Sequence, residues 1–304
     1  RGFNVVCAFV NDIIDAPTIE ALKQSDTGLI ALRSAGYNNV DLNAAYKNIH
    51  VVRVPAYSPH AVAEHSVALL MTINRKIHRA YSRIRDMNFN INGLLGFDIH
   101  GKTVGVIGTG KIGREFVHIM KGFGTRVIAY DVHPDKNFAR SAGFDYVSLD
   151  KLFFESDIIS LHCPLLKDTH HLINKSSIDK MKDGVILLNT SRGKLINTQD
   201  LINGLKSKKI GAAGLDVYEE ESDVFFEDFS DSFINDDILA RLTTFPNVMI
   251  TSHQGFFTQE ALHNIAKTTL ENIREFIDGD ALSNEVCYRC KEKVCRKEEK
   301  GRCF

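Results

Sequence analysis

Three ionisable residues in the second half of the chain, Arg192, Glu221 and His253, have side chains that could bind a carboxylate and move a proton. The arginine guanidinium is a planar, two-pronged donor that matches a carboxylate. A histidine titrates near neutral pH, so it can give a proton and take it back. A nearby glutamate favours the protonated form of such a histidine. Each residue alone is more often an ion-pair partner or a solvated loop residue, so the prediction rests on their combination.

Polar or conformationally special residues recur where short apolar, strand-like runs end. This set comprises Gly108, Asp131, His162-Cys163-Pro164, Thr190-Ser191-Arg192, Asp216 and His253. Ligands of an open parallel sheet bind beyond the carboxyl ends of its strands. Because unrelated loops would not deliver such residues so regularly, we expect the set to face one site.

The most specific motif in this set is a G-x-G-x-x-G sequence formed by Gly108, Gly110 and Gly113, between an apolar run and a helical pattern. The three glycines suit a tight turn, close approach of the backbone to a pyrophosphate, and close helix–strand packing. The helix N-terminus at Lys111-Ile112 would offer N–H groups to the phosphates. Asp131, at the end of the next run, would bind ribose hydroxyls and repel a 2′-phosphate, which predicts NAD rather than NADP.

Given that cofactor, the three ionisable residues favour one reaction class. Hydride transfer to a 2-keto acid needs a cation for the substrate carboxylate, a proton donor for the carbonyl oxygen and a carboxylate that supports the donor. Arg192, His253 and Glu221 could fill these roles in that order.

Alternation of apolar runs with helical patterns predicts the fold class, an α/β doubly wound parallel sheet. The expected strands are Val5–Val10, Leu29–Leu32, Val51–Val54, Thr103–Ile107, Arg126–Tyr130, Asp157–Leu161, Val185–Leu188, Ala212–Leu215 and Val248–Thr251. The expected helices include one from Ser58-Pro59 to about Ile84, and Ile112–Gly122, Thr198–Ser207 and Gln259–Phe276. We expect an NAD-binding Rossmann domain over 58–255. A smaller, split α/β domain would comprise 1–57 and 256–286, followed by a cysteine-rich basic tail, 287–304.

Composition limits the partners. The 304 residues carry a formal net charge of −1, which argues against nucleic acid, and no run is apolar and long enough for a membrane span. Cys7 and Cys163 stand alone in apolar runs, so we expect two buried thiols and a cytoplasmic, reducing environment. Because the chain begins at Arg1, just before an expected strand, we also expect residues to precede it.

The chain resembles the D-isomer-specific 2-hydroxyacid dehydrogenases in three blocks, NTSRG (189–193), GLDVYEEE (214–221) and TSHQG (251–255). The resemblance extends from about Val5 to Val286 and implies the split two-domain architecture, with a flavodoxin-like substrate domain. It implies Arg192, Glu221 and His253 as catalytic residues. It implies substrate contacts at Ala35, Gly36, Tyr57 and Arg192, and cofactor contacts at Gly108, Gly110, Lys111, Ile112, Gly113, Asp131, His162, Cys163, Pro164, Thr190, Ser191 and Asp216.

Within that family, three stretches look most like the fermentative D-lactate dehydrogenases: LRSAGYNNVD (32–41), VPAYSP (54–59) and the insert DVFFED (223–228). This resemblance implies pyruvate and D-lactate as substrates, and a homodimer formed through the nucleotide domain. Two alternatives remain open. One is a relative that reduces larger keto acids, such as 2-hydroxyisocaproate dehydrogenase. The other is an NAD-responsive binding protein, since some family members act as corepressors. An inactive fragment is a third possibility.

The two ends depart from the family pattern. The family begins with a further strand and helix, and it usually ends near Val286. Here four cysteines follow, Cys287, Cys290, Cys295 and Cys303, together with seven Lys or Arg residues. Four thiolates suit zinc or an iron–sulfur cluster, but the spacing does not form two C-x-x-C pairs. We therefore expect no metal and a solvated or redox-labile tail.

Overall fold

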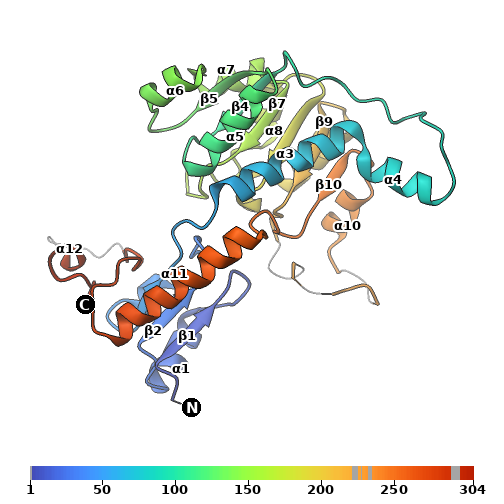
Figure 1. The fold of residues 1–304 in the computed structure, drawn as a ribbon. Helices are drawn as coiled ribbons and strands as arrows, with labels where there is room; N and C mark the ends of the chain where they lie inside the picture. The colour runs from blue at the N-terminus through green and yellow to red at the C-terminus, as the bar shows by residue number, and fades with distance from the viewer. Residues whose placement is uncertain (1, 221–224, 227, 232–234, 289–294) are drawn as a thin grey trace. The chain divides into compact units, whose positions relative to one another are not determined.

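The chain divides into two compact units in a computed structural model that describes residues 2–220, 225–226, 228–231, 235–288 and 295–304. One unit comprises residues 1–58 and 257–304, and the other comprises residues 59–256 (Figure 1). None of the helices in the described ranges is long and apolar enough to cross a bilayer. Each unit has its own sheet and is described by itself.

The larger unit is built on a seven-stranded parallel sheet. Its strands are β4 (Thr103–Ile107), β5 (Arg126–Tyr130), β6 (Asp145–Tyr146), β7 (Ile158–Leu161), β8 (Val185–Asn189), β9 (Ile210–Leu215) and β10 (Val248–Ile250). Their order is β10-β9-β8-β7-β4-β5-β6, and every pairing is parallel. The strand order reverses between β4 and β7, which is the point where doubly wound sheets bind nucleotides.

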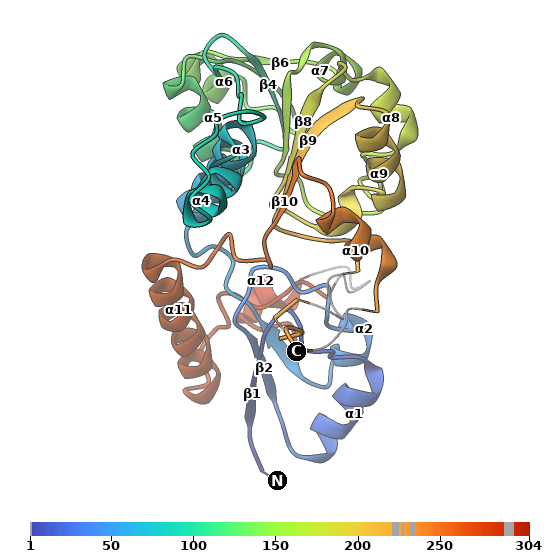
Figure 2. The ribbon, with the colours of Figure 1, turned by 90° about the vertical axis from the view of Figure 1, so that its right-hand side faces the viewer.

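Helices cover both faces of this sheet, which explains why its strands read as continuous apolar runs (Figure 2). Within β7, Ile158 belongs to the core beneath α3 and α5, whereas its neighbour Ile159 belongs to the core on the opposite face. The first face carries α3 (Pro59–Arg75), α5 (Lys111–Gly122) and α6 (Lys136–Ala142). The second carries α7 (Leu149–Glu155), α8 (Lys175–Lys180), α9 (Thr198–Lys206) and α10 (Asp237–Thr243).

The prediction of one helix from Pro59 to about Ile84 is wrong, because the helix breaks at Lys76. Lys76 has a left-handed φ of +51°, and α4 (Ile77–Arg85) starts a new direction after it. The chain returns across the break: the Asn74 amide donates to the Phe97 carbonyl (2.8 Å) and accepts from the Phe97 N–H (3.0 Å). The contact joins α3 to a residue more than twenty positions further along the chain. The spacing of apolar residues, on which the helix prediction was based, carries no information about such a contact.

The smaller unit has a three-stranded parallel sheet in the order β1-β2-β3. Its elements are β1 (Val5–Ala8), α1 (Ala16–Gln24), β2 (Leu29–Leu32), α2 (Leu42–Ala45), β3 (His50–Val52) and the long α11 (Gln259–Ile277). One face packs on α1 and α2, with Ile19, Ile30 and Val51 in the core. The other packs on α11, where Ile273 and Phe276 contact the cluster of Leu29, Ala31 and Val52.

Of the two expected buried thiols, only Cys163 is buried, and the prediction for Cys7 is wrong. Cys7 lies on β1, at one edge of the described three-stranded sheet, and it is exposed. Ala8, the next residue, points into the core formed with α1. Cys7 points to the opposite face, where Val5 of the same strand, rather than Cys7, packs against the cluster of Leu29, Ala31 and Val52.

Three described residues of the tail, Tyr288, Cys303 and Phe304, pack in or against the core that contains Val51, so the expectation of a solvated tail is wrong for them. Cys287, Arg296 and residues 298–300 are exposed. The segment after α11 pairs with the free edge of β3: the Val286 N–H donates to the Val51 carbonyl (2.8 Å), and the Val51 N–H donates to the Tyr288 hydroxyl (2.6 Å). Val52 and Glu285 form an antiparallel bridge there. Tyr288 is only 6% exposed.

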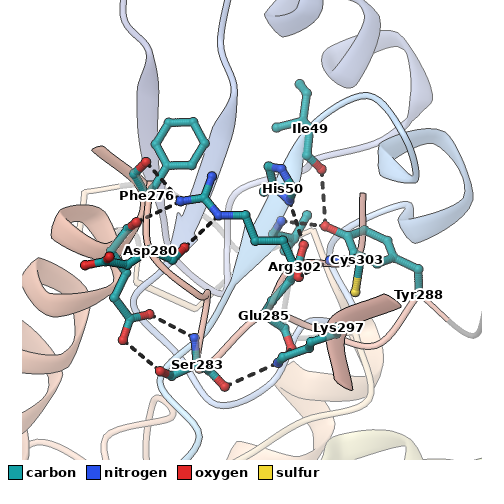
Figure 3. Close-up of polar contacts among 12 residues, drawn as sticks. Ile49, His50, Phe276, Asp280, Ser283, Glu285, Tyr288, Lys297, Arg302 and Cys303 are labelled. Atoms are coloured by element: carbon teal, nitrogen blue, oxygen red, sulfur yellow. Dashed lines mark hydrogen bonds and ion pairs between the residues drawn. The ribbon is translucent and has the colours of Figure 1, made fainter. Parts of the chain in front are cut away.

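A buried carboxylate joins this edge to the end of the chain (Figure 3). Glu285 Oε1 lies 2.7 Å from His50 Nδ1, and Glu285 Oε2 accepts the Cys303 N–H at 2.8 Å. Phe304 stacks on the His50 ring at a centroid distance of 4.2 Å. Burial and the hydrogen bond with Glu285 raise the pKa of the Cys303 thiol to about 12, so it stays protonated. Hydrophobic anchors and hydrogen bonds, rather than thiol chemistry, hold the tail in place.

No group of three or more His, Cys, Asp and Glu side chains in the described ranges is placed to hold a metal ion. The five described cysteines, which include Cys287, Cys295 and Cys303, are free thiols. Cys290 lies outside the described residues. The short helix α12 (Arg296–Lys300) instead brings Arg302 to the carbonyl oxygens of Glu275 (2.8 Å) and Asp280 (2.7 Å).

Removing the Tyr288 hydroxyl should destabilise the protein. Tyr288→Phe leaves the buried Val51 N–H without its acceptor, and an unsatisfied buried donor costs about 1–3 kcal/mol. Urea unfolding should show this loss, whereas Tyr81→Phe, on an exposed ring, should change stability by less than about 0.5 kcal/mol. Equal unfolding midpoints for wild type and Tyr288→Phe would contradict the described packing.

Candidate active site

The expected site residues of the larger unit lie at the carboxyl ends of six of its strands. Gly108 follows β4, Asp131 follows β5, and the His162–Pro164 turn follows β7. The turn of Thr190, Ser191 and Arg192 follows β8, Asp216 follows β9, and His253 lies after β10. In a parallel sheet these ends share one edge, so the structure brings together the residues that were predicted to converge.

The glycine-rich turn makes the close approaches that its motif predicts. Gly108 has a φ of +94°, and a Cβ there would lie 2.7 Å from the His162 carbonyl oxygen and the Cys163 nitrogen. A Cβ on Gly113 would lie 2.1 Å from the Gly108 carbonyl oxygen. At Gly110 a Cβ would meet nothing within 4 Å, so this glycine borders open space. Only at Gly110, therefore, is there room beside the backbone for a ligand.

Open space beside Gly110 lies at the N-terminus of α5, which has no side-chain cap. The first-turn N–H groups, including those of Lys111 and Ile112, have no partner within the helix and carry partial positive charge. A pyrophosphate suits both the space and the charge. The residues present therefore fit the diphosphate of a dinucleotide.

Asp131 is held ionised at the end of β5 by hydrogen bonds. Its Oδ2 accepts from the Thr109 N–H (2.7 Å) and hydroxyl (3.0 Å), and its Oδ1 accepts from the His133 N–H (2.9 Å). Burial alone would raise the pKa of Asp131, but these hydrogen bonds outweigh it and hold the pKa below its ordinary value. A fixed carboxylate here fits ribose hydroxyls and disfavours a 2′-phosphate.

The turn after β7 is apolar and uncharged. Burial lowers the pKa of His162 to about 3, and its ring is neutral beside the Ser160 hydroxyl, 2.8 Å from Nε2. Burial likewise raises the pKa of the Cys163 thiol to about 11. Both groups are therefore suited to shaping a cofactor cleft with the exposed Pro164, and not to acid–base or nucleophilic chemistry.

The turn that carries Arg192 is fixed by the buried side chain of Asn189. Its Oδ1 accepts the Ser191 N–H (3.0 Å), and its Nδ2 donates to the Arg192 carbonyl (2.9 Å). The Ser191 hydroxyl then donates to the Cys163 carbonyl (2.7 Å), which joins this turn to the one after β7. On the other side, Thr190 exchanges a 2.8 Å hydrogen bond with Ser66 of α3. Asn189 thus fixes the backbone from which Arg192 projects, and Arg192 Nη1 itself donates to the Ser191 carbonyl (2.6 Å).

Asp216 organises the turn that carries His253. Its side chain is almost completely buried, and Oδ1 accepts from the Thr251 hydroxyl (2.6 Å) and the Gln254 N–H (2.9 Å). Its Oδ2 accepts the Gly255 N–H at 2.7 Å. Burial would raise the pKa of Asp216, but the hydrogen bonds that it accepts outweigh burial and lower the pKa. This geometry supports a positioning role for Asp216.

His253 stands at the centre of that turn in an unusual backbone conformation. Its φ is +48°, and its N–H donates to the Asp216 carbonyl at 2.8 Å. A left-handed conformation is costly for a non-glycine residue and persists only where its surroundings impose it. The hydrogen bonds around Asp216 supply that constraint, so the direction in which the His253 side chain leaves the backbone is set by β9 and β10.

The remaining expected site residues lie elsewhere. Glu221 lies outside the described residues. Ala35, Gly36 and Tyr57 belong to the smaller unit. There the Ala35 carbonyl accepts from Arg53 Nη1 (2.9 Å) and the Gly36 carbonyl from the Ser34 hydroxyl (2.8 Å). The Tyr57 carbonyl accepts from the Asn264 amide (2.6 Å).

The sequence analysis did not predict His65 and Thr109, which hydrogen-bond to residues of the candidate site. His65, on α3, lies 3.2 Å from Asp216 Oδ1 and 3.0 Å from the Thr251 hydroxyl. Thr109, between two motif glycines, binds Asp131 and the Tyr146 hydroxyl (2.7 Å). The sequence did contain one indication for His65, because the polar pair His65-Ser66 interrupts the apolar pattern of α3. Nothing in the sequence indicated the role of Thr109.

Comparisons with known proteins give the family. Residues 67–255 match the family described as "D-isomer specific 2-hydroxyacid dehydrogenase, NAD binding domain". The D-lactate dehydrogenase of Escherichia coli is 52% identical over 94% of this chain and 87% of its own. The solved pyruvate reductase of Chlamydomonas reinhardtii has a TM-score of 0.88 at 47% identity, over 93% of this chain and 86% of its own.

A third relative was solved with ligands. The D-lactate dehydrogenase of Aquifex aeolicus, complexed with NAD and lactic acid, has a TM-score of 0.84 at 35% identity, over 93% of this chain and 86% of its own. The chain belongs to the family of D-isomer specific 2-hydroxyacid dehydrogenases. It is therefore an NAD-dependent oxidoreductase, and the predicted cofactor is confirmed.

Replacing Gly110 should weaken cofactor binding without weakening the fold. In Gly110→Ala the new methyl group meets no protein atom but occupies the open space that fits the pyrophosphate. We expect at least a tenfold rise in the NADH dissociation constant, equivalent to about 1.4 kcal/mol, with an unchanged melting temperature. Gly122→Ala, at the other end of α5 and equally unobstructed, should change neither. Normal NADH titration of Gly110→Ala, followed by fluorescence, would contradict this placement.

Proposed function

We propose that this chain catalyses reversible hydride transfer between NADH and pyruvate, giving D-lactate. The observation that carries this proposal is the order β10-β9-β8, which places His253, Asp216 and Arg192 after three adjacent strands. A proton donor, its positioning carboxylate and a carboxylate-binding cation thus share one stretch of the sheet edge. The relatives named D-lactate dehydrogenase and pyruvate reductase support the choice of substrate.

The proposed roles follow from the chemistry of the side chains. When bound, the cofactor supplies the hydride for C2 of the substrate. Arg192 holds the substrate carboxylate through its two-pronged donor. His253 donates its proton to the carbonyl oxygen as the alkoxide develops, and retakes it in the reverse reaction. Glu221, by its place in the matching block, would keep His253 protonated before transfer.

By the resemblance to the family, the backbone N–H groups of Ala35 and Gly36 would donate to the substrate carboxylate. Their carbonyl oxygens accept hydrogen bonds from Arg53 and Ser34. Tyr57 would contact the substrate from the segment that leads into the larger unit.

We further propose a homodimer formed through α4 and the segment after it. Figure 1 shows both extending away from the sheet of the larger unit. They expose apolar side chains, including Ile84 (54%), Met87 (77%), Ile91 (80%) and Leu95 (87%). Several exposed apolar side chains on one projecting segment are typical of a protein interface. A second copy of this chain is the partner that the resemblance to dimeric dehydrogenases favours.

We place the enzyme in the cytoplasm. The five cysteines in the described ranges are free thiols, which is typical of a reducing compartment. Use of NADH and a small keto acid is consistent with that location.

The test of the proposed reaction is steady-state oxidation of NADH with pyruvate, comparing wild type with His253→Ala. Loss of the proton donor should lower kcat by about 10²–10⁴-fold, while the NADH dissociation constant stays the same. His263→Ala, an exposed histidine on α11, should behave as wild type. A His253→Ala enzyme within tenfold of wild type would remove His253 from the mechanism. A higher kcat/KM for 2-ketoisocaproate than for pyruvate would transfer the assignment to a larger acid.

The dimer is tested by placing charge in the exposed apolar set. The double variant Ile84→Glu, Ile91→Glu should sediment as a monomer at micromolar concentration, because an unpaired carboxylate in an apolar interface is strongly disfavoured. Leu270→Glu, on an exposed position of α11 in the smaller unit, should leave the dimer intact. A wild-type chain that sediments as a monomer would refute the proposal.

A further inference from the structure

Glu219, the first residue of the acidic run 219–221, is not the solvated side chain that its composition implies. Its side chain is 18% exposed, and both carboxylate oxygens are engaged. Oε1 lies 2.5 Å from His171 Nε2. Oε2 accepts from the N–H (3.0 Å) and the hydroxyl (2.8 Å) of Thr198. The next residue, Glu220, is exposed.

The partners of Glu219 come from two other segments of the larger unit. Thr198 is the first residue of α9, so the carboxylate also satisfies an N–H group at a helix start. His171 lies after β7 in a left-handed conformation (φ +50°), and its N–H donates to the Lys194 carbonyl at 2.9 Å. One side chain therefore ties together the connections that follow β7, β8 and β9.

This tie adjoins the turn that carries Arg192. A Cβ on Gly193 would lie 1.9 Å from the Tyr218 carbonyl oxygen and 2.5 Å from the Glu219 nitrogen. The backbone at Gly193 thus rests directly on the backbone at 218–219. A shift of either segment by a fraction of an ångström must be transmitted to the other, because interiors packed this closely have no room to absorb it.

The carboxylate is ionised in this setting. Burial would raise the pKa of Glu219, but the hydrogen bonds from Thr198 and His171 outweigh it and lower the pKa. A charged acceptor strengthens each of these hydrogen bonds relative to a neutral one. Removing the carboxylate would leave the partly buried Thr198 and His171 donors without their acceptor.

We propose that Glu219, held by His171 and Thr198, is a positioning residue for the reaction. It fixes the backbone on which the Arg192 turn rests, and it lies two residues before Glu221 in the sequence. The inference rests on the proposed function, because positioning has meaning only for a site that uses Arg192. Glu219 itself touches neither the substrate nor the cofactor in this account.

The kinetic test compares Glu219→Ala with its exposed neighbour, Glu220→Ala. Misplacing a catalytic group by about 1 Å can cost about 100-fold, so Glu219→Ala should lower kcat/KM for pyruvate by about that factor. The NADH dissociation constant should rise by less than about tenfold, because the contacts proposed for the diphosphate and ribose, at the glycine-rich turn and Asp131, follow β4 and β5. Glu220→Ala should match wild type. A Glu219→Ala enzyme within threefold of wild type, or one that loses NADH affinity in proportion to activity, would overturn the proposal.

Two substitutions of His171 separate positioning from general loss of stability. In His171→Gln the side-chain amide can replace the Nε2 donor to Glu219, whereas His171→Phe fills similar volume without a donor. Gln should restore most of the activity, and Phe should resemble Glu219→Ala. Equal activity of the two variants would overturn the proposal even if both melt at lower temperature.

A measurement independent of turnover distinguishes failure of this inference from failure of the proposed function. Amide hydrogen exchange in Glu219→Ala should accelerate in 192–197 and in 217–220 together, with Glu220→Ala unchanged. If wild type does not reduce pyruvate, the proposed function fails, whereas coupled acceleration would still show that Glu219 holds the backbone of the Arg192 turn. Unchanged exchange in 192–197 would overturn it.

Discussion

The buried carboxylate of Asp216 is the interaction on which the rest of the site depends. A charge that is 1% exposed is tolerated only when its lone pairs are satisfied, and here Thr251, Gln254 and Gly255 satisfy them from the turn after β10. Removing one partner of such a buried charge typically costs about 3–5 kcal/mol. The same bonds hold His253 at a positive φ, so the stability of the fold and the direction of the candidate proton donor have one physical cause.

Other turns at this edge of the sheet are also held by a polar side chain that hydrogen-bonds to their backbone. Asn189 closes the turn that bears Arg192, and Asp131 closes the glycine-rich turn through Thr109. Each connection leaves the strand with backbone groups that have no ladder partner, and a buried polar side chain satisfies them. The polar residues at the strand ends therefore position the loops as well as face a ligand. Glu219 extends this arrangement to the connections that lie further from the substrate.

Sequence reasoning succeeded where spacing along the chain decides the structure. The three motif glycines, Asp131 and the buried strands of the larger sheet are determined locally, by turn geometry and by apolar runs covered on both faces. It failed where a distant segment decides. His65 reaches Asp216 only because α3 crosses β9, and the helix break at Lys76 depends on the returning chain at Phe97. For the tail, the prediction was based on the many basic and cysteine residues and gave no role to Tyr288. In the structure the Tyr288 ring is buried.

The central claim is that these strand ends form one stereospecific hydride-transfer site. The most direct measurement is the initial rate of NAD reduction by the protein with D-lactate and with L-lactate, each enantiomerically pure. In the proposed mechanism Arg192 holds the substrate carboxylate and His253 meets the substrate oxygen, which would leave only one face of C2 toward the cofactor. We expect the D isomer to react at least about 10²-fold faster than the L isomer. Equal rates, or a preference for the L isomer, would contradict it.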